Sequence, residues 1–297
     1  MSRVPLADAP VSPTGDAGAG VNQPGAGLEH KHRALRRLLD GIPSLIVAYS
    51  GGVDSAFLAH IASDVLGSRV LCVTADSPSY PDRHRRMARD LAERFGFHHE
   101  IIHTAELERP EYRANPANRC YYCKHELYSH LTGIARERGI AVIADGSNAD
   151  DRGDYRPGRQ AAREFGVRSP LDDVGLTKEE IRELSRRAGL PTWDEPASAC
   201  LSSRIPYFSE VTDEKLRTIE RAEEILRDLG FRICRVRHHD TIARIELGRD
   251  EMPRALEAEI AATIDRELRA LGYQHVVVDL RGYRLGSLND ALRLRPV

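Results

Sequence analysis

Short runs of apolar residues alternate, over the first part of the chain, with longer stretches in which apolar positions recur at helical spacing. The short runs predict β-strands, and the longer stretches predict helices. The predicted strands are Leu45–Tyr49, Val70–Ala75, Glu100–His103 and Ala141–Asp145, and the predicted helices are Val53–Leu66, Asp82–Phe95, Lys124–Arg138 and Thr177–Ala188. Strands that alternate with helices of this length are typical of βαβ units. The pattern therefore predicts an α/β fold with a parallel sheet.

The pattern changes after Ile205 and Pro206. From there the spacing predicts, in order, a long helix, two strands of alternating polarity, a second helix and a last strand. These elements are Thr212–Leu229, Arg232–His238, Ile242–Leu247, Arg254–Leu271 and His275–Leu280. We therefore expect an α/β domain over residues 29–206 and a small α+β domain over residues 207–297. Residues 1–28 are mostly Ala, Gly, Pro and polar residues, and this composition predicts a disordered tail.

The charge of the chain is nearly balanced, with 43 Lys and Arg against 45 Asp and Glu. No overall field therefore favours a polyanionic partner such as nucleic acid. The longest apolar runs are too short to span a bilayer, and the first residues lack the basic and apolar segments of a secretory signal. Five cysteines, an odd number, do not suggest a disulfide framework. These features predict a cytoplasmic protein with reduced thiols and no membrane partner.

The segment Ser50-Gly-Gly-Val-Asp-Ser55 follows the first predicted strand and opens the first predicted helix. Two glycines allow the backbone to approach an anion closely, and the N-terminus of a helix offers unpaired N–H groups. The hydroxyls of Ser50 and Ser55 add donors, whereas the segment lacks the Lys-Ser/Thr pair of a Walker loop. Asp54 suits either a Mg²⁺ ion beside a phosphate or a cap of the helix. The whole string favours a phosphate site over an ordinary strand–turn–helix corner.

Three of the cysteines occur in segments that suggest chemistry. Cys120 and Cys123 lie close together in the segment NRCYYCK, and Cys200 lies on a stretch between two prolines, which favours a constrained loop. A structural zinc ion is one alternative, and it would need a fourth ligand such as His125. A redox disulfide is less favoured, because two tyrosines separate the cysteines of the pair. Sulfur transfer is the third alternative.

Two strands of the second predicted domain carry regularly spaced charges. Residues two apart in a strand share a face, so Arg235 and Arg237 point to one side while Cys234, which we expect to be structural, points to the other. Arg244 and Glu246 likewise share a face of the next strand. A solvated face is the simplest explanation. However, arginines that lie directly opposite each other are destabilising, and a bound anion would relieve this repulsion.

Five motifs occur in order along the chain: SGGVDS, NRCYYCK, DGSNADDRGDYRPG, SACLSSRIPY and RVRHHDTIARIEL. The first resembles the phosphate-binding turn of the pyrophosphate-loop ATPases. Together, over residues 29–297, they resemble the LarE-type ATP-dependent sulfur transferases, which build the nickel-pincer nucleotide cofactor. The resemblance implies an adenine-nucleotide-alpha-hydrolase-like parallel sheet with helices on both faces, followed by a small α+β domain. Phe208 departs from the family pattern, in which Gly follows the fourth motif.

The resemblance also implies an activity and the residues that perform it. With Mg²⁺ present, ATP is expected to adenylate a carboxylate of pyridinium-3,5-biscarboxylic acid mononucleotide. The adenylated carboxylate is then expected to become a thiocarboxylate, and ATP is expected to leave as AMP and pyrophosphate. The residues expected to hold the pyrophosphate of ATP are Ser50, Gly51, Gly52, Asp54 and Ser55. Arg204, Arg235 and Arg237 are expected to bind the substrate. Asp54, Glu246 and Cys200 are the expected catalytic residues, with Glu246 near the metal or the reacting centre.

The family obtains its sulfur in two ways. Some members sacrifice one cysteine at the position of Cys200, which becomes dehydroalanine. Others have all three cysteines and bind a [4Fe–4S] cluster, in which three thiolates leave one iron open for an extra sulfide. Since this chain has Cys120, Cys123 and Cys200, the resemblance implies the cluster and a separate sulfide donor, with the sacrificial route as the alternative. It also implies a homo-oligomer such as a hexamer.

Three other classes of function stay open. A pyrophosphate-loop enzyme that thiolates transfer RNA also uses ATP and three cysteines, but it is disfavoured by the balanced charge and by the lack of zinc ribbons or a basic arm. An amidating ligase needs no cysteine trio. A nucleotide or redox sensor without catalysis would not need so many polar loops at the carboxyl edge of the sheet.

Overall fold

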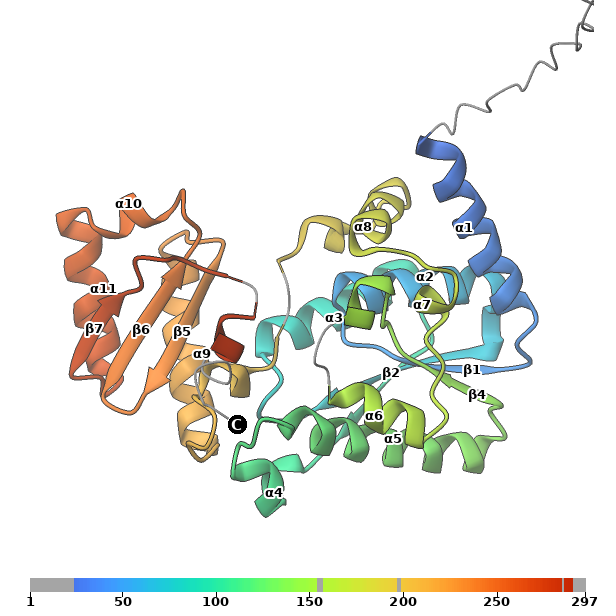
Figure 1. The fold of residues 1–297 in the computed structure, drawn as a ribbon, viewed down its shortest axis with the longest axis horizontal. Coiled ribbons are helices and arrows are strands. Elements are labelled where there is room, and N and C mark those ends of the chain that lie inside the picture. The colour runs from blue at the N-terminus through green and yellow to red at the C-terminus, as the bar shows by residue number, and fades with distance from the viewer. Residues whose placement is uncertain (1–23, 154–156, 197–198, 285, 291–297) are drawn as a thin grey trace, which may run out of the picture.

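The computed structural model describes residues 24–153, 157–196, 199–284 and 286–290 of the chain. Its larger sheet has parallel strands in the order β3-β2-β1-β4, of which β2, β1 and β4 are labelled in Figure 1. These strands are β1 (Leu45–Ala48), β2 (Val70–Asp76), β3 (His99–His103) and β4 (Val142–Ala144). The predicted α/β fold with a parallel sheet is confirmed.

Helices cover both faces of this sheet. Successive residues of its central strands point to opposite sides, and since both sets are apolar, each face packs against helices. Leu45 and Val47 of β1 lie in one apolar core, whereas Ile46 and Ala48 lie in another. The helices of the first core are α1 (Pro24–Asp40), α2 (Val53–Leu66), α3 (Asp82–Phe95), α7 (Pro170–Asp173) and α8 (Lys178–Arg187). The helices of the second core are α5 (Arg119–Arg138) and α6 (Gly158–Glu164). Burial on both faces explains why the central strands read as continuous apolar runs.

Most predicted elements match the structure to within one or two residues, but the helix that carries the cysteine pair does not. Helix α5 begins at Arg119 rather than at Lys124, with Asn118 as its N-cap residue. Cys120 and Cys123 therefore lie in the first turns of a helix and not on a loop before it. In this geometry their side chains lie near the same face, because residues three apart are neighbours on a helix surface.

Two further differences concern helix boundaries. The predicted helix Arg254–Leu271 is two helices, α10 (Met252–Ala255) and α11 (Ala258–Ala270), because the backbone is extended at Glu257. Helix α1 was not predicted, and it includes residues 24–28, which composition assigned to the tail. Residues 1–23 of that tail lie outside the described residues.

The second part of the chain forms a three-stranded sheet in the order β5-β6-β7. β5 (Cys234–His239) and β6 (Ile242–Leu247) form an antiparallel hairpin, and β7 (His275–Val278) runs parallel to β6. One face packs against α9 (Asp213–Asp228) and α11 in a core that includes Cys234 and Val236. The opposite face of β5 therefore carries Arg235 and Arg237, as their spacing predicts.

An apolar cluster joins the two parts of the molecule. It connects α4 (Pro110–Arg113), the 3₁₀ turn Leu201–Arg204 and α9, and its buried members are Tyr112, Leu201, Ile205, Val211, Leu216 and Ile219. The segment that carries Cys200 thus lies between the two parts of the molecule, although a domain boundary near residue 206 stays a prediction. Within the described residues, every helix is too short or too polar to cross a membrane.

Candidate active site

The glycine turn lies at the carboxyl end of β1, where α2 begins. Gly51 has a φ of 64°, a left-handed conformation that favours glycine, and a Cβ added there would lie 2.8 Å from the Cβ of Ala88. The Ser55 hydroxyl accepts a hydrogen bond from the Ser50 N–H at 3.1 Å and donates to the Gly52 carbonyl. The turn is therefore closed by its own serines, and it presents the N-terminus of α2 as an anion site would require.

Asp54 lies in the first turn of α2, but it does not cap the helix. The N-cap residue is Gly52, with no side-chain cap hydrogen bond. The Asp54 carboxylate forms an ion pair with Lys178 through Oδ2, while its buried Oδ1 has no hydrogen-bond partner in the described part of the chain. Burial raises the pKa of Asp54, although the charge of Lys178 opposes this rise. The capping alternative is therefore wrong, and one oxygen of Asp54 is left for another ligand.

A second loop, after β4, lies against the glycine turn. A Cβ on Gly146 would lie 2.9 Å from the backbone nitrogen of Ser55, so only glycine allows this approach. The neighbouring Asp145 accepts hydrogen bonds from Tyr128 at 3.0 Å and from Ser169 at 2.8 Å, which fix the loop. This loop opens the motif DGSNADDRGDYRPG, of which residues 154–156 lie outside the described residues.

The three cysteines of interest approach one another from two segments. Cys120 and Cys123 come from α5, and Cys200 precedes the turn Leu201–Arg204. Cys120 keeps access to solvent, yet its thiol lies among protein atoms, and this burial, together with the nearby Cys200, raises its pKa while Arg119 lowers it. Burial, followed by the charges of Glu106 and Cys200, also raises the pKa of Cys123. Both thiols must lose a proton before they could bind a metal or act as nucleophiles.

These cysteines do not form a metal site as they stand. In the described residues, no group of three or more His, Cys, Asp or Glu side chains is arranged to hold a metal ion. The chemical type of three thiols suits a cluster with three protein ligands, but their positions do not yet match one. His125, the alternative zinc ligand, faces the aromatic ring of Phe165 instead.

A short turn after β2 connects the glycine turn with the Cys200 segment. Tyr80 donates a hydrogen bond to the Ser50 carbonyl at 2.9 Å, and the Leu201 N–H donates to the Ser79 carbonyl at 2.8 Å. The hydroxyl of Ser79 in turn donates to the buried carboxylate of Glu106 at 2.7 Å. The phosphate-type turn and the cysteine segment therefore share one support at the carboxyl edge of the sheet.

Arg204 occupies a different position from the one expected for a substrate ligand. Its side chain is 1% exposed, and it donates to both carboxylate oxygens of Glu223, at 2.8 and 3.0 Å. Its remaining nitrogen donates to the carbonyls of Ala199 and Cys200, at 2.7 and 2.9 Å. Arg204 thus ties the cysteine segment to α9, and this geometry suits a positioning role.

The arginines of the three-stranded sheet gather around a carboxylate of the same chain. Arg237 lies directly opposite Arg244, but the side chain of Glu246, which is 1% exposed, pairs with both arginines. Glu246 accepts a hydrogen bond from Arg237 at 2.7 Å and pairs with Arg244 at 3.2 Å. The repulsion that suggested an external anion is therefore already relieved. Arg235 is buried beside these residues, over the ring of Tyr283.

Phe208 occupies a position that favours glycine. Its φ is 68°, and its side chain is 54% exposed. A non-glycine residue in this conformation is strained. The departure from the family pattern therefore keeps the glycine-type backbone and adds an exposed aromatic ring.

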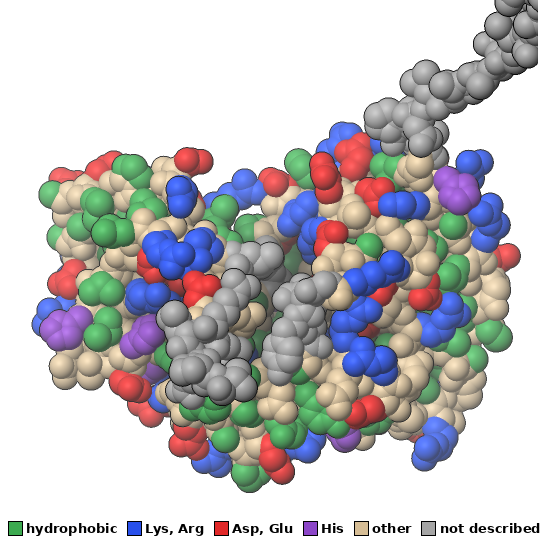
Figure 2. All heavy atoms as spheres, viewed as in Figure 1, with side chains coloured by type: hydrophobic (Ala, Val, Ile, Leu, Met, Phe, Trp, Pro, Cys, Tyr) green, Lys and Arg blue, Asp and Glu red, His purple; other side chains and the backbone are tan. Residues whose placement is uncertain are grey.

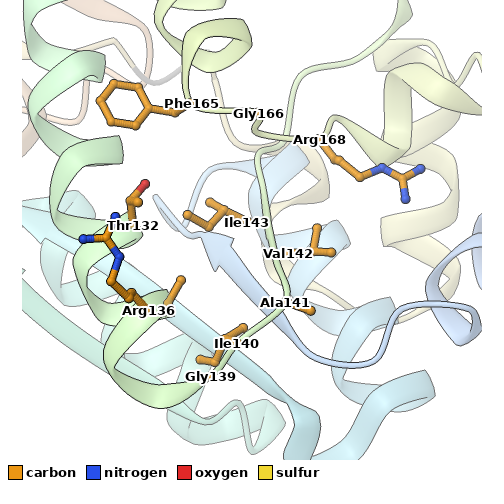
Figure 3. Close-up of a pocket in the computed structure, with 11 residues that line it drawn as sticks. Thr132, Arg136, Gly139, Ile140, Ala141, Val142, Ile143, Phe165, Gly166 and Arg168 are labelled. Carbon is orange, nitrogen blue, oxygen red and sulfur yellow. The ribbon is translucent and has the colours of Figure 1, made fainter.

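A pocket of about 440 Å³ lies away from these residues. It is lined by the end of α5, the start of β4 and the segment near Phe165 and Arg168 (Figure 3). The residues before β4 are at the amino end of a parallel strand, whereas the glycine turn follows the carboxyl end of β1. This pocket contains no residue that the motifs point to.

Several residues of this region were not predicted. They are Tyr80, Glu106, Arg119, Lys178 and Glu223. Each contacts a segment distant in the sequence, and for Arg119 this contact is a hydrogen bond to the Ser202 carbonyl at 2.9 Å. For Lys178 the only local signal is its place after Thr177, which forms a capping box with Glu180 and so fixes where the helix starts.

The fold and the glycine turn define a class, the pyrophosphate-loop enzymes that use ATP. The family model described as asparagine synthase matches residues 32–117, which include β1, the turn and β2. A subunit of the glutamine-hydrolyzing GMP synthase of Methanopyrus kandleri is 27% identical over 68% of this chain and 68% of its own length.

Two other relatives match nearly the whole chain. An uncharacterized protein of Synechocystis is 43% identical over 89% of this chain and 99% of its own length. The pyridinium-3,5-bisthiocarboxylic acid mononucleotide synthase of Lactiplantibacillus plantarum is 36% identical over 90% of this chain and 96% of its own length. The chain therefore belongs to the LarE-type family of ATP-dependent sulfur transferases.

Proposed function

We propose that the protein adenylates a carboxylate of pyridinium-3,5-biscarboxylic acid mononucleotide and converts it to a thiocarboxylate for the nickel-pincer cofactor. The observation that carries this proposal is the shared support of the glycine turn and the Cys200 segment by the turn Ser79–Tyr80. An adenylated carboxylate must meet a sulfur nucleophile, so the phosphate site and the thiols have to lie at one edge of the sheet. The Lactiplantibacillus plantarum relative is named as the synthase of pyridinium-3,5-bisthiocarboxylic acid mononucleotide. That compound is the proposed substrate with sulfur in its carboxylates, and this supports the assignment.

In this proposal the glycine turn holds the polyphosphate of ATP. Backbone N–H groups at the start of α2 and the hydroxyls of Ser50 and Ser55 would bind its oxygens, with Gly51 and Gly52 allowing close approach. The free oxygen of Asp54 suits Mg²⁺, a cation that prefers oxygen ligands and often bridges a carboxylate and phosphates. When bound, Mg²⁺ would neutralise charge that develops on the leaving pyrophosphate.

The substrate phosphate would lie against the basic face of β5. We propose that Arg235 and Arg237 bind it, while Glu246 holds the guanidinium of Arg237 in position. Arg204 would act through Cys200, whose carbonyl it holds, rather than by contact with the substrate. The face shown in Figure 2 intermixes basic and acidic side chains, which suits a small-molecule substrate better than a nucleic acid.

The sulfur would come from the three-cysteine site. We propose that Cys120, Cys123 and Cys200 bind a [4Fe–4S] cluster, which needs the three side chains to move into ligand positions and to lose their protons. The alternative is that Cys200 itself gives up its sulfur. A separate sulfide donor, a homo-oligomeric state and a cytoplasmic location also stay predictions.

The products formed from ATP test the proposal. We expect AMP and pyrophosphate in the presence of Mg²⁺ and the dicarboxylate mononucleotide. Asp54→Asn should remove most of this activity, because a neutral amide binds the metal weakly. Release of ADP and phosphate, or AMP release that requires ammonia, would refute the assignment.

The source of sulfur is tested separately. If Cys120→Ala and Cys123→Ala keep thiolation while Cys200→Ala abolishes it, the sacrificial route is correct. Mass spectrometry would then find Cys200 lighter by the mass of hydrogen sulfide after one turnover. Loss of thiolation in all three variants, with loss of bound iron, would support the cluster. Stoichiometric zinc would refute both routes.

A further inference from the structure

Lys178 is the one lysine whose side chain contacts the glycine turn motif in the described residues. It is the first residue of α8, and the capping box of Thr177 and Glu180 fixes the backbone there. The backbone N–H of Lys178 also donates to the Asp150 carboxylate at 2.8 Å, so both the capping box and Asp150 hold this part of the backbone. The side chain itself is 34% exposed, and its flexible four-carbon stem can reorient without movement of the helix.

The ion pair between Lys178 and Asp54 leaves the carboxylate half satisfied. Lys178 pairs with Oδ2, whereas the buried Oδ1 has no partner in the described part of the chain. A buried carboxylate oxygen without a partner is costly. Asp151 adds a further negative charge near Asp54, and Arg182 adds a positive one. A second cation, in addition to the Lys178 ammonium, would therefore be attracted to the carboxylate of Asp54. The ammonium lies beside the position that this cation would take.

We propose that Lys178 occupies the carboxylate of Asp54 while the site is empty and exchanges it for the polyphosphate when ATP arrives with its divalent metal. This inference rests on the proposed binding of ATP. A divalent cation competes for the same carboxylate, and the displaced ammonium then has phosphate oxygens as its new partners. Lys178 thus weakens the binding of bare metal to the empty site and adds one positive charge to the nucleotide complex.

Calorimetric titration of Lys178→Met separates this role from a structural one. Mn²⁺ alone should bind the variant about fivefold more tightly than the wild type, because the competing ammonium is gone. ATP with Mn²⁺ should bind about tenfold to a hundredfold more weakly, because a charge-assisted contact is lost. The two changes have opposite signs, and this combination is the result that the exchange predicts.

Lys31→Met is the matched control. Lys31 of α1 pairs with Glu180 of α8, the helix that also carries Lys178. The side chains of the Lys31–Glu180 pair are 31% and 26% exposed, close to the 34% and 23% of Lys178 and Asp54. This control should lose a similar amount of stability and bind Mn²⁺ and ATP like the wild type. If Lys178→Met also leaves both affinities unchanged, its ion pair only braces α8 against α2 and the inference is wrong.

A second measurement uses the unmodified protein. Competitive labelling of amines, read by mass spectrometry, should find Lys178 more reactive with Mn²⁺ alone than in the empty protein, and least reactive with ATP and Mn²⁺ together. Equal reactivity in all three conditions would overturn the exchange. If the wild type binds no ATP at all, the proposed function fails as well, whereas ATP binding without these changes refutes only the role of Lys178.

Discussion

The buried ion pair between Arg204 and Glu223 offers a sharp test of how the Cys200 segment is held. Both side chains are 1% exposed, and Arg227 also donates to Glu223 at 2.8 Å. Glu223→Gln keeps the size of the side chain and removes only the charge. It would leave the guanidinium of Arg204 buried without its counter-ion, still bonded to the carbonyls of Ala199 and Cys200.

Two estimates of the cost agree. Removal of one partner from a buried ion pair typically destabilises a protein by about 3–5 kcal/mol. Burial alone would raise the pKa of Glu223, but the charge and hydrogen bonds of Arg204, together with the charges of Arg235 and Arg227, outweigh burial and lower it from 4.5 to about 2. A shift of that size corresponds to about 3 kcal/mol. We therefore expect Glu223→Gln to lower the free energy of unfolding by about 3 kcal/mol.

Urea unfolding followed by circular dichroism measures this cost. The control is Glu210→Gln, which breaks the ion pair with Arg113, whose side chains are 49% and 51% exposed. An exposed pair is worth about 0–1 kcal/mol, so this control should stay close to the wild type. If Glu223→Gln costs no more than the control, the pair is not the anchor of the Cys200 segment, and the reasoning fails.

The same carboxylate predicts a dependence on pH. The folded-state pKa of Glu223 lies below its usual value of 4.5, so its contribution is complete above about pH 4.5 and is lost as the pH falls toward about 2. The unfolding free energy of the wild type should fall in this range more steeply than that of Glu223→Gln. Equal slopes for the two proteins would contradict the depressed pKa.

Three further predictions concern the site. Gly51→Ala should weaken ATP binding at least about tenfold, because its Cβ collides with α3 and its φ is positive; calorimetry that finds wild-type affinity would refute the role of the turn. Arg237→Ala should weaken binding of the mononucleotide about tenfold to a hundredfold, with partial rescue by Arg237→Lys, whereas unchanged affinity would support a purely structural arginine. Protein purified without air should carry about four irons per chain and lose them in Cys120→Ala or Cys200→Ala, and iron retained in both variants would exclude these ligands.

The sequence predicted the fold well because its strongest signals are local. Strands buried on both faces, such as Leu45–Ala48, read as apolar runs, and a capping box of Thr177 and Glu180 opens the predicted helix Thr177–Ala188. Helix α1 was missed because its start lies in a segment of Gly, Ala and polar residues, and its one-sided burial comes from packing on α2. Local patterns report the period of a chain, but not where a helix is stabilised by its neighbours.

The site was predicted less completely, because its charges are decided by tertiary contacts. The register that opposes Arg237 and Arg244 could be predicted from the hairpin, but the pairing of Glu246 with both arginines could not. The family resemblance suggested that Arg204 is a substrate ligand, whereas its partner Glu223 lies on α9. A lone arginine in a sequence does not reveal which carboxylate reaches it in the fold.

The most direct test of the account follows the substrate itself. Purified protein is incubated without air with ATP, Mg²⁺, sulfide and pyridinium-3,5-biscarboxylic acid mononucleotide, and the mononucleotide is then analysed by mass spectrometry. We expect a product in which sulfur replaces a carboxylate oxygen, with one AMP and one pyrophosphate released for each sulfur atom transferred. Cleavage of ATP with no thiocarboxylate, or a product in which nitrogen replaces the oxygen, would contradict the central claim that this chain is a sulfur transferase for that substrate.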